Sequence, residues 1–307
     1  MRIDTLTYHN VETQGARRRA WLREHSPQHL QQCAALMLSA LNQRGPGASR
    51  ATLVLGAGAC TEIPLAELAR RSDEVVLADF DLASMRQAWE ELESPALRRR
   101  VRLLECELTG GVSAKLHRLL ARQRWDALIA QGARAVFDAA ATCLEQCAMP
   151  DPPQLDTLGA GECGLVISSL TLSQLFSYPL LDVLDHVQQL APTYLNEQEH
   201  HHRYQQAAQD FRVRIIQSHL HLLRELLDTG GLAALLSDVR GFVFNVSGTD
   251  HDAGHRRAIP LVPRVFPELV SGTFTVMQEE HWEWITDLPE KDKFGRGYEV
   301  VGYVLKR

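Results

Sequence analysis

The sequence predicts an α/β fold: a doubly wound, Rossmann-like, mainly parallel sheet of seven strands with an N-terminal helical extension. Short apolar runs alternate with segments of helical spacing between residues 51 and 236, and two further β-like runs follow. Strands that alternate with helices need crossover connections, which build a parallel sheet with helices on both faces. The 307 residues are enough for one large core, so we divide the chain into an extension, 1–50, and a sheet domain, 51–307.

The extension is expected to be mostly helical. Apolar residues recur at helical spacing after Pro27, and a Gly-Pro-Gly turn at 45–47 ends the pattern. Tyr8, His9 and Trp21 are candidates for a lid over a ligand pocket. The alternative is that they only dock the extension on the sheet.

The sheet domain alternates between two hydrophobic periods. The expected strands are 51–55, 74–78, 101–104, 164–169, 232–236, 272–284 and 298–305. The expected helices cover 63–71, 82–99, 112–147 and 204–227. Within the third of these helices, the apolar residues 126–129 leave a short strand as an alternative.

Composition excludes several classes of function. Lys and Arg number 32 against 38 Asp and Glu, a net charge of −6, whereas a general nucleic-acid binder needs a basic excess to meet phosphates. No run approaches the roughly 20 apolar residues of a membrane-spanning helix. The N-terminal residues contain no apolar signal core, and the six scattered cysteines suit reduced thiols. We therefore expect a cytoplasmic protein that binds neither nucleic acid nor membrane.

The first strand runs into a glycine turn. Gly56 and Gly58 permit a tight bend on which a ligand can lie against the backbone, and Asp79 ends the next strand. A carboxylate at that position accepts hydrogen bonds from ribose hydroxyls in nucleoside-binding βαβ units. Thr61 stands where a dinucleotide site has its third glycine, and no P-loop lysine follows. A ligand with ribose and adenine but no pyrophosphate fits better.

With these motifs, the chain resembles the class I S-adenosylmethionine (SAM)-dependent methyltransferases over roughly residues 50–305. The matching segments are Val54-Leu55-Gly56-Ala57-Gly58, Val75 to Asp81, Cys106-Glu107-Leu108 and Leu165 to Leu170. The resemblance implies SAM as co-substrate. It implies that the methionyl and ribose parts of SAM lie over Gly56, Ala57 and Gly58, and that Asp79 and Asp81 bind the ribose. It implies that Phe80, Glu107 and Leu108 contact the adenine. Ser168 and Ser169, at the end of the fourth strand, complete the implied cofactor-binding set. For Asp81, capping of the next helix is an equal alternative.

Three positions depart from the family pattern. Val54 replaces a frequent acid, and Cys60 replaces a frequent third glycine. The segment 168–171 replaces the Asn/Asp-Pro-Pro-aromatic signature, which resembles the amino-group methylases of nucleic acids and of protein glutamine. The usual guide to the acceptor is therefore missing.

Candidate catalytic residues follow the fourth and fifth strands, on the side where ligands bind in such sheets. Tyr178, His251 and His255 are the candidates for a base that removes a proton from the acceptor, with Tyr194 as a further substrate-side tyrosine. No metal site is expected. Cys143 and Cys147 are more consistent with core packing, and three consecutive histidines at 200–202 point in different directions on a helix.

The expected function is methyl transfer from SAM to a small-molecule acceptor in metabolite or natural-product biosynthesis. A rival retains SAM but attacks its aminobutyrate chain, by intramolecular cyclisation or aminocarboxypropyl transfer, and releases methylthioadenosine. A non-catalytic partner protein of the same fold is a second alternative, which Val54 and Cys60 leave open. Thr61 and the two terminal strands argue against an NAD-dependent oxidoreductase. The oligomeric state stays open.

Overall fold

Apolar side chains cover both faces of the central strands, as expected for a parallel sheet between two helical layers. The computed structural model describes residues 21–155, 158–244, 257–289 and 294–307. Along β1 (Ala51–Leu55), Leu53 and Leu55 face one core while Val54 faces the other. This alternation fixes which helices each strand contacts.

The strand order is β3-β2-β1-β4-β5-β8-β7, with β6 paired to β5. Five strands are mutually parallel: β1, β2 (Glu74–Asp79), β3 (Val101–Glu105), β4 (Cys163–Ser169) and β5 (Leu227–Phe244). Three pair antiparallel: β6 (Arg257–Pro260), β7 (Thr275–Asp287) and β8 (Gly295–Lys306). The doubly wound, mainly parallel sheet is thereby confirmed, with β6 as an eighth strand beyond the seven expected.

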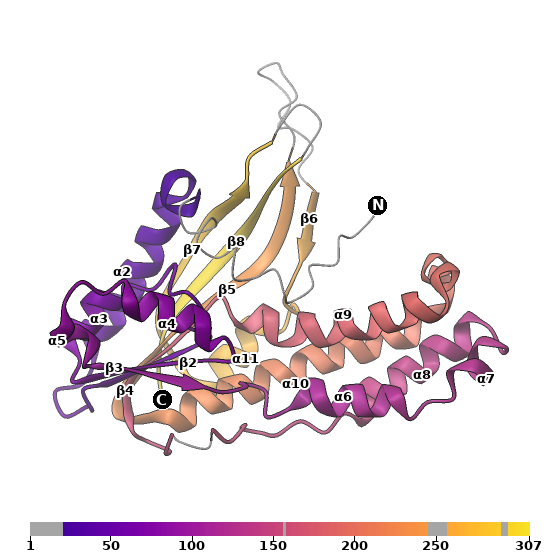
Figure 1. Cartoon of the computed structure of the whole chain (residues 1–307), viewed down its shortest axis with the longest axis horizontal. Helices are drawn as coiled ribbons and strands as arrows, with labels where there is room; N and C mark the ends of the chain where they lie inside the picture. The colour runs from indigo at the N-terminus through magenta and orange to yellow at the C-terminus, as the bar shows by residue number, and fades with distance from the viewer. Residues whose placement is uncertain (1–20, 156–157, 245–256, 290–293) are drawn as a thin grey trace.

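Two helical layers enclose this sheet (Figure 1). One contains α2 (Pro27–Gln43), α3 (Leu65–Arg71), α4 (Leu82–Glu90) and the short α5 (Pro95–Arg98). The other contains α6 (Val112–Ala121), α8 (Ala133–Gln146), α9 (Leu172–Leu190), α10 (His202–Leu226) and α11 (Phe266–Thr273). The short elements α7 (Trp125–Ile129), η2 (Pro192–Asn196) and η3 (Gln198–His200) lie between helices of the second layer.

Helix α2 packs on the last strands of the chain. The imidazole of His29 stacks on Trp284 at 4.4 Å between ring centroids, and Trp282 Nε1 donates to His29 Nδ1 at 2.9 Å. The Ser26 hydroxyl donates to the Ile285 carbonyl at 2.6 Å. The described part of the extension thus belongs to a helical layer of the sheet. Of the lid candidates, Tyr8 and His9 lie outside the described residues.

Several elements differ from the sequence-based expectation. Residues 126–129, for which a strand was the alternative, belong to helix α7, and the expected helix 112–147 is divided into three. Gly132, at a φ of 99°, separates α7 from α8. Helices α9 and α11 had not been expected. Cys143 and Cys147 are fully buried in the core, as predicted.

The four strands that carry the candidate ligand residues end at one edge of the sheet, because parallel strands share their carboxyl edge. Figure 1 shows β5 to β8 extending beyond the other strands. None of the helices in the described ranges is long and apolar enough to cross a membrane.

Candidate functional site

The glycine turn after β1 is held against the end of β2. The N–H groups of Gly56 and Ala57 both donate to the Ala78 carbonyl, at 2.8 and 3.3 Å. Gly56 and Gly58 have φ angles of 67° and 45°, in the left-handed region that glycine adopts without a Cβ clash. The bend predicted from the sequence is therefore present at the carboxyl edge.

The two glycines are required for different reasons. A Cβ on Gly56 would stand 1.8 Å from Thr171 Oγ1, so this glycine lets the turn and the start of α9 approach each other. A Cβ on Gly58 would meet nothing nearer than Asp79 Oδ2, at 4.0 Å. The space over Gly58 is thus open, and this is the part of the turn on which a ligand can lie.

Asp79 joins the turn to the second strand. Its side chain is 8% exposed, and its two oxygens accept hydrogen bonds from the N–H groups of Gly58 and Asp81, each at 2.9 Å. Burial raises the pKa of the Asp79 carboxyl, while those two N–H groups lower it. A carboxylate has about four acceptor positions. The Phe80 N–H also acts on this carboxyl, and the acceptor capacity that remains can receive a donor such as a ribose hydroxyl.

Phe80 and Asp81 continue from Asp79 at the same edge. Phe80 is 54% exposed although it is a large aromatic residue, so its ring can cover a ligand. Asp81 is the N-cap of α4: its Oδ1 accepts from the Ser84 N–H at 3.0 Å and its Oδ2 from the Ser84 hydroxyl at 2.5 Å. The capping alternative for Asp81 is therefore what the structure shows.

Glu107 and Leu108 follow β3, as expected, but differ in surroundings. The Glu107 side chain organises its own turn, because Oε1 accepts from the Thr109 N–H at 2.9 Å and Oε2 from the Gly111 N–H. It is exposed, so an adenine amino group can still reach it. Leu108 is buried against the helices of the second layer rather than lying open at the edge.

The two serines at the end of β4 have different environments. Ser168 is fully buried, and its hydroxyl lies 2.8 Å from Nε2 of His219 on α10. Ser169 is also buried, and its hydroxyl has no hydrogen-bond partner in the described part of the chain. A buried hydroxyl without a partner is unfavourable. Ser169 is thus a candidate ligand-binding group at the carboxyl edge, whereas Ser168 serves the core.

Of the candidate bases and the further candidate Tyr194, only Tyr178 is placed near the site by the described residues. Tyr178 lies in α9, the helix that follows β4, and its side chain is 40% exposed. His251 and His255 lie outside the described residues. Tyr194 is not at the site: its hydroxyl donates to the Ile129 carbonyl of α7 at 3.0 Å, and α7 lies at the end of the helical layer away from the strands (Figure 1). It fixes a helix connection instead of facing a substrate.

The sequence did not reveal three features of the site. Cys60 and Leu170 adopt φ angles of 50° and 54°, although neither is glycine, and Thr171 fills the space beside Gly56. Backbone strain of this kind at a turn is of order 1–3 kcal/mol and needs support from its surroundings. The only signal for Cys60 was its position where a third glycine is frequent.

These residues fit a nucleoside with a polar tail. Acceptor capacity on Asp79, open space over Gly58 and the partnerless hydroxyl of Ser169 meet at the ends of three neighbouring strands. Ribose hydroxyls need acceptors, a bend without side chains admits close contact, and the serine can bond an amino or carboxylate group. No group of three or more His, Cys, Asp or Glu side chains suited to a metal occurs among the residues that the structure describes.

Comparisons with known proteins give similarity in fold alone. No protein-family model and no curated protein matches the chain. Among solved structures, a SAM-dependent methyltransferase from Aquifex aeolicus is 11% identical with a TM-score of 0.37, over 88% of this chain and 87% of that one. The glycopeptide N-methyltransferase MtfA complexed with SAM is 13% identical with a TM-score of 0.38, over 90% and 94%. Geranyl diphosphate C-methyltransferase from Streptomyces coelicolor is 10% identical with a TM-score of 0.38, over 89% and 77%.

The fold therefore rests on this chain's own strand order and register. The sheet is Rossmann-like, and the antiparallel β8 lies between β5 and β7 as expected from the two closing strands. That is the architecture expected of a class I SAM-dependent methyltransferase.

Because His219 is buried beside Ser168, we expect the free energy of unfolding to depend on pH. Burial lowers the pKa of His219 to about 4 from 6.5, so the unfolded chain binds the proton more readily between these values. The free energy of unfolding should therefore fall as pH decreases through this range, by about 1.4 kcal/mol per pH unit. Urea denaturation at about pH 7 and at about pH 5 measures the free energy of unfolding. Between these two pH values, the native chain should lose about 2 kcal/mol more of this free energy than His219→Gln loses.

His202→Gln is the matched control, because His202 lies on the same helix and is exposed. It should lose as much stability on acidification as the native chain. If His219→Gln does so too, the buried imidazole does not cause the pH dependence.

Proposed function

We propose that the chain binds SAM at the carboxyl edge of the sheet and transfers its methyl group to a small molecule. The observation that carries the proposal is the pairing of the open turn at Gly58 with the buried carboxylate of Asp79. The turn offers backbone surface, and the carboxylate offers acceptors to a pair of hydroxyls.

Different residues of the chain would bind different parts of SAM. Asp79 would accept from the ribose hydroxyls and Phe80 would cover the adenine. Glu107 would accept from the adenine amino group in addition to its own turn. Ser169 would donate to the methionyl carboxylate. Each assignment uses a group whose burial, exposure or hydrogen-bond capacity is described above.

When bound, SAM supplies an electrophilic methyl group on a sulfonium. The chain's contribution is to align the acceptor with that methyl and to exclude water. If the acceptor atom begins protonated, a base must remove the proton, and we propose Tyr178, His251 and His255 for this role. Tyr178 is favoured among the described residues because α9 begins where β4 ends.

Two observations on the sequence favour a small-molecule acceptor over a polymer. The net charge of −6 disfavours a phosphate backbone. The segment 168–171 does not carry the sequence associated with methylation of nucleic-acid or glutamine amino groups. An enclosed organic acceptor is compatible with both observations.

Replacing Asp79 tests the ribose contact. Asp79→Ala removes both acceptor oxygens, so the affinity for S-adenosylhomocysteine should fall by about 1–3 kcal/mol, or roughly 5- to 150-fold. Isothermal titration calorimetry measures it directly. Asp126→Ala, an exposed acid in α7, is the control and should bind like the native chain. Equal affinity in the native chain and Asp79→Ala would exclude the carboxylate from the binding site.

The two glycines of the turn should respond differently to alanine. In Gly58→Ala the new methyl group occupies open space and adds only the strain of a left-handed backbone, so the thermal midpoint should fall slightly and the affinity for S-adenosylhomocysteine should fall. In Gly56→Ala the methyl group also collides with Thr171, so the thermal midpoint should fall further. Thermal unfolding combined with calorimetry separates the effects. Unchanged affinity in folded Gly58→Ala would mean that no ligand lies over this turn.

Product analysis tests the reaction itself. After incubation with SAM and a cell extract, mass spectrometry should find S-adenosylhomocysteine in amounts that depend on the native chain and fall with Asp79→Ala. Methylthioadenosine as the product would instead assign the chemistry to the aminobutyrate chain. Binding of SAM without either product, across extracts of varied composition, would favour a non-catalytic protein of this fold.

A further inference from the structure

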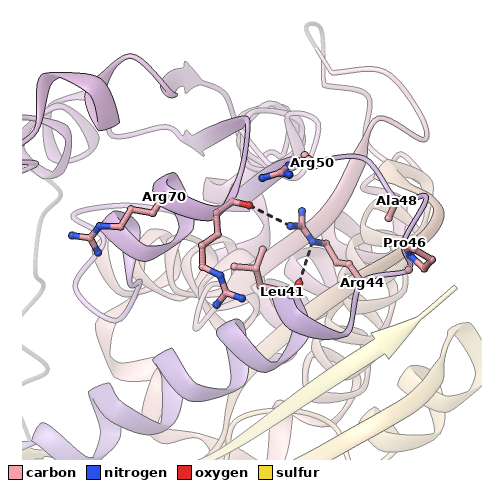
Figure 2. Close-up of a pocket in the computed structure, with 8 residues that line it drawn as sticks. Leu41, Arg44, Pro46, Ala48, Arg50 and Arg70 are labelled. Atoms are coloured by element: carbon pink, nitrogen blue, oxygen red, sulfur yellow. Dashed lines mark hydrogen bonds between the residues drawn. The ribbon is translucent and has the colours of Figure 1, made fainter.

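A second surface, at the opposite edge of the sheet, gathers four arginines around one groove. The groove has a volume of about 470 Å³ and is lined by Arg44, Arg50, Arg70 and Arg71 together with Leu41, Gly45, Pro46 and Ala48. Figure 2 shows Arg44 and Arg50 near each other, whereas the Arg70 side chain points away from both. This concentration of positive charge contrasts with the chain's net charge of −6. We call this surface the arginine groove.

The arginine groove is separate from the site proposed for SAM. Arg50 directly precedes β1, and Arg71 ends α3, the helix that leads back to the start of β2. The glycine turn and Asp79 follow the other ends of the same two strands. Strands of five and six residues span about 17–20 Å, so one ligand does not contact both sites directly.

Part of the arginine cluster has a structural role. Arg44 Nε donates to the Leu41 carbonyl at 3.2 Å, and a terminal nitrogen reaches the Arg71 carbonyl at 3.5 Å, as the dashed lines of Figure 2 show. These carbonyls lie at or near the ends of α2 and α3, where a cation is favourable. Capping therefore accounts for Arg44, but it does not account for the arginines beside it.

The charges in the groove are only partly balanced by carboxylates. Arg50 Nε lies 3.1 Å from Asp73 Oδ1, and Arg70 pairs with Glu67. Over the described residues, the side-chain hydrogen bonds of Arg44 and Arg71 go to neutral acceptors. Arg44 donates to backbone carbonyls, and Arg71 donates to the Asn42 amide oxygen. Within the described part of the chain, the guanidinium groups of Arg44 and Arg71 thus lack a carboxylate at ion-pair distance.

The electrostatics of Arg44 indicate the same excess of positive charge. Burial lowers the pKa of its guanidinium, the neighbouring charges of Arg50 and Arg71 lower it further, and Asp228 and Asp73 act in the opposite direction. Like charges held together are unfavourable unless a counter-charge is supplied. An anion in the groove would supply it.

The loop that forms the floor is fixed in place before any ligand binds. The Gly45 N–H donates to the Gly230 carbonyl at 3.1 Å, and the Ser49 N–H donates to the Asp228 carboxylate. A Cβ on Gly164 would stand 1.8 Å from the Ser49 carbonyl oxygen, so the loop also lies against β4. A loop held at both ends and packed on a strand loses little further freedom on binding.

We propose that the arginine groove binds a small anion that carries a diphosphate. Guanidinium groups match phosphoryl oxygens in pairs, which makes arginine suited to phosphate recognition. The arginines come from two segments, the loop between α2 and β1 and the end of α3, around a cavity larger than a single tetrahedral anion needs, so two linked phosphoryl groups suit it better than one. Few apolar side chains line the groove, and the ligand's contacts are therefore mainly through its charged part.

Inorganic pyrophosphate is the probe, titrated into the full chain by calorimetry at low ionic strength. Pyrophosphate should bind at least about tenfold more tightly than phosphate or sulfate, and added salt should weaken it. The double variant Arg50→Gln/Arg71→Gln should lose about tenfold or more in affinity. It leaves the contacts of Arg44 with the helix ends in place. Arg71→Lys retains the charge but loses the planar fork, and should weaken pyrophosphate binding more than sulfate binding.

Two control variants distinguish pyrophosphate binding in the arginine groove from a general effect of positive charge and from binding at the proposed SAM site. Arg203→Gln removes an exposed arginine that pairs with Glu145 and does not line the groove, and it should bind pyrophosphate like the native chain. Asp79→Ala should do so too, whatever it does to S-adenosylhomocysteine. Thermal unfolding confirms that each variant is folded. The proposal is overturned if pyrophosphate does not bind, if sulfate binds equally well, or if Arg203→Gln weakens binding as much as the groove double variant.

Discussion

The parallel register between β1 and β2 is the constraint on which the candidate site depends. Leu55 pairs with Ala78, so the residues that follow each strand emerge side by side. The Ala78 carbonyl then receives two N–H groups of the turn, and the Asp79 carboxylate receives a third from Gly58. A shift of one residue would send the Asp79 side chain to the other face of the sheet. Burial of both faces of the strands prevents that shift.

Strands that are buried on both sides are readable in a sequence, which is why the central sheet could be predicted. β1, β2 and β4 are almost continuously apolar because helices cover them on either face. The glycine turn and Asp79 were found for a similar reason: glycines and an acid at strand ends stand out against apolar surroundings. The fold class, and the position of the central candidate residues at the carboxyl edge, therefore followed from local pattern.

The elements that were not predicted lack such a local signal. Helix α9 contains Pro179, which normally argues against a helix interior, yet the chain continues through it. Strand β6 has four exposed residues and owes its conformation to pairing with β5. The left-handed conformations of Cys60 and Leu170 depend on tertiary contacts rather than on residue type. The role of Tyr194 likewise required knowledge of where α7 lies.

Helix α2 completes one face of the sheet by contacts with strands made much later. His29 and its partner Trp282 are 253 residues apart in sequence. Contacts of such separation form slowly, because a long loop must close before they stabilise anything. During synthesis on the ribosome, the part of α2 around His29 completes its contacts only when β7 has emerged. That part of the helix therefore stays uncovered on the nascent chain until the last strands are made, and an uncovered apolar surface of this kind favours aggregation.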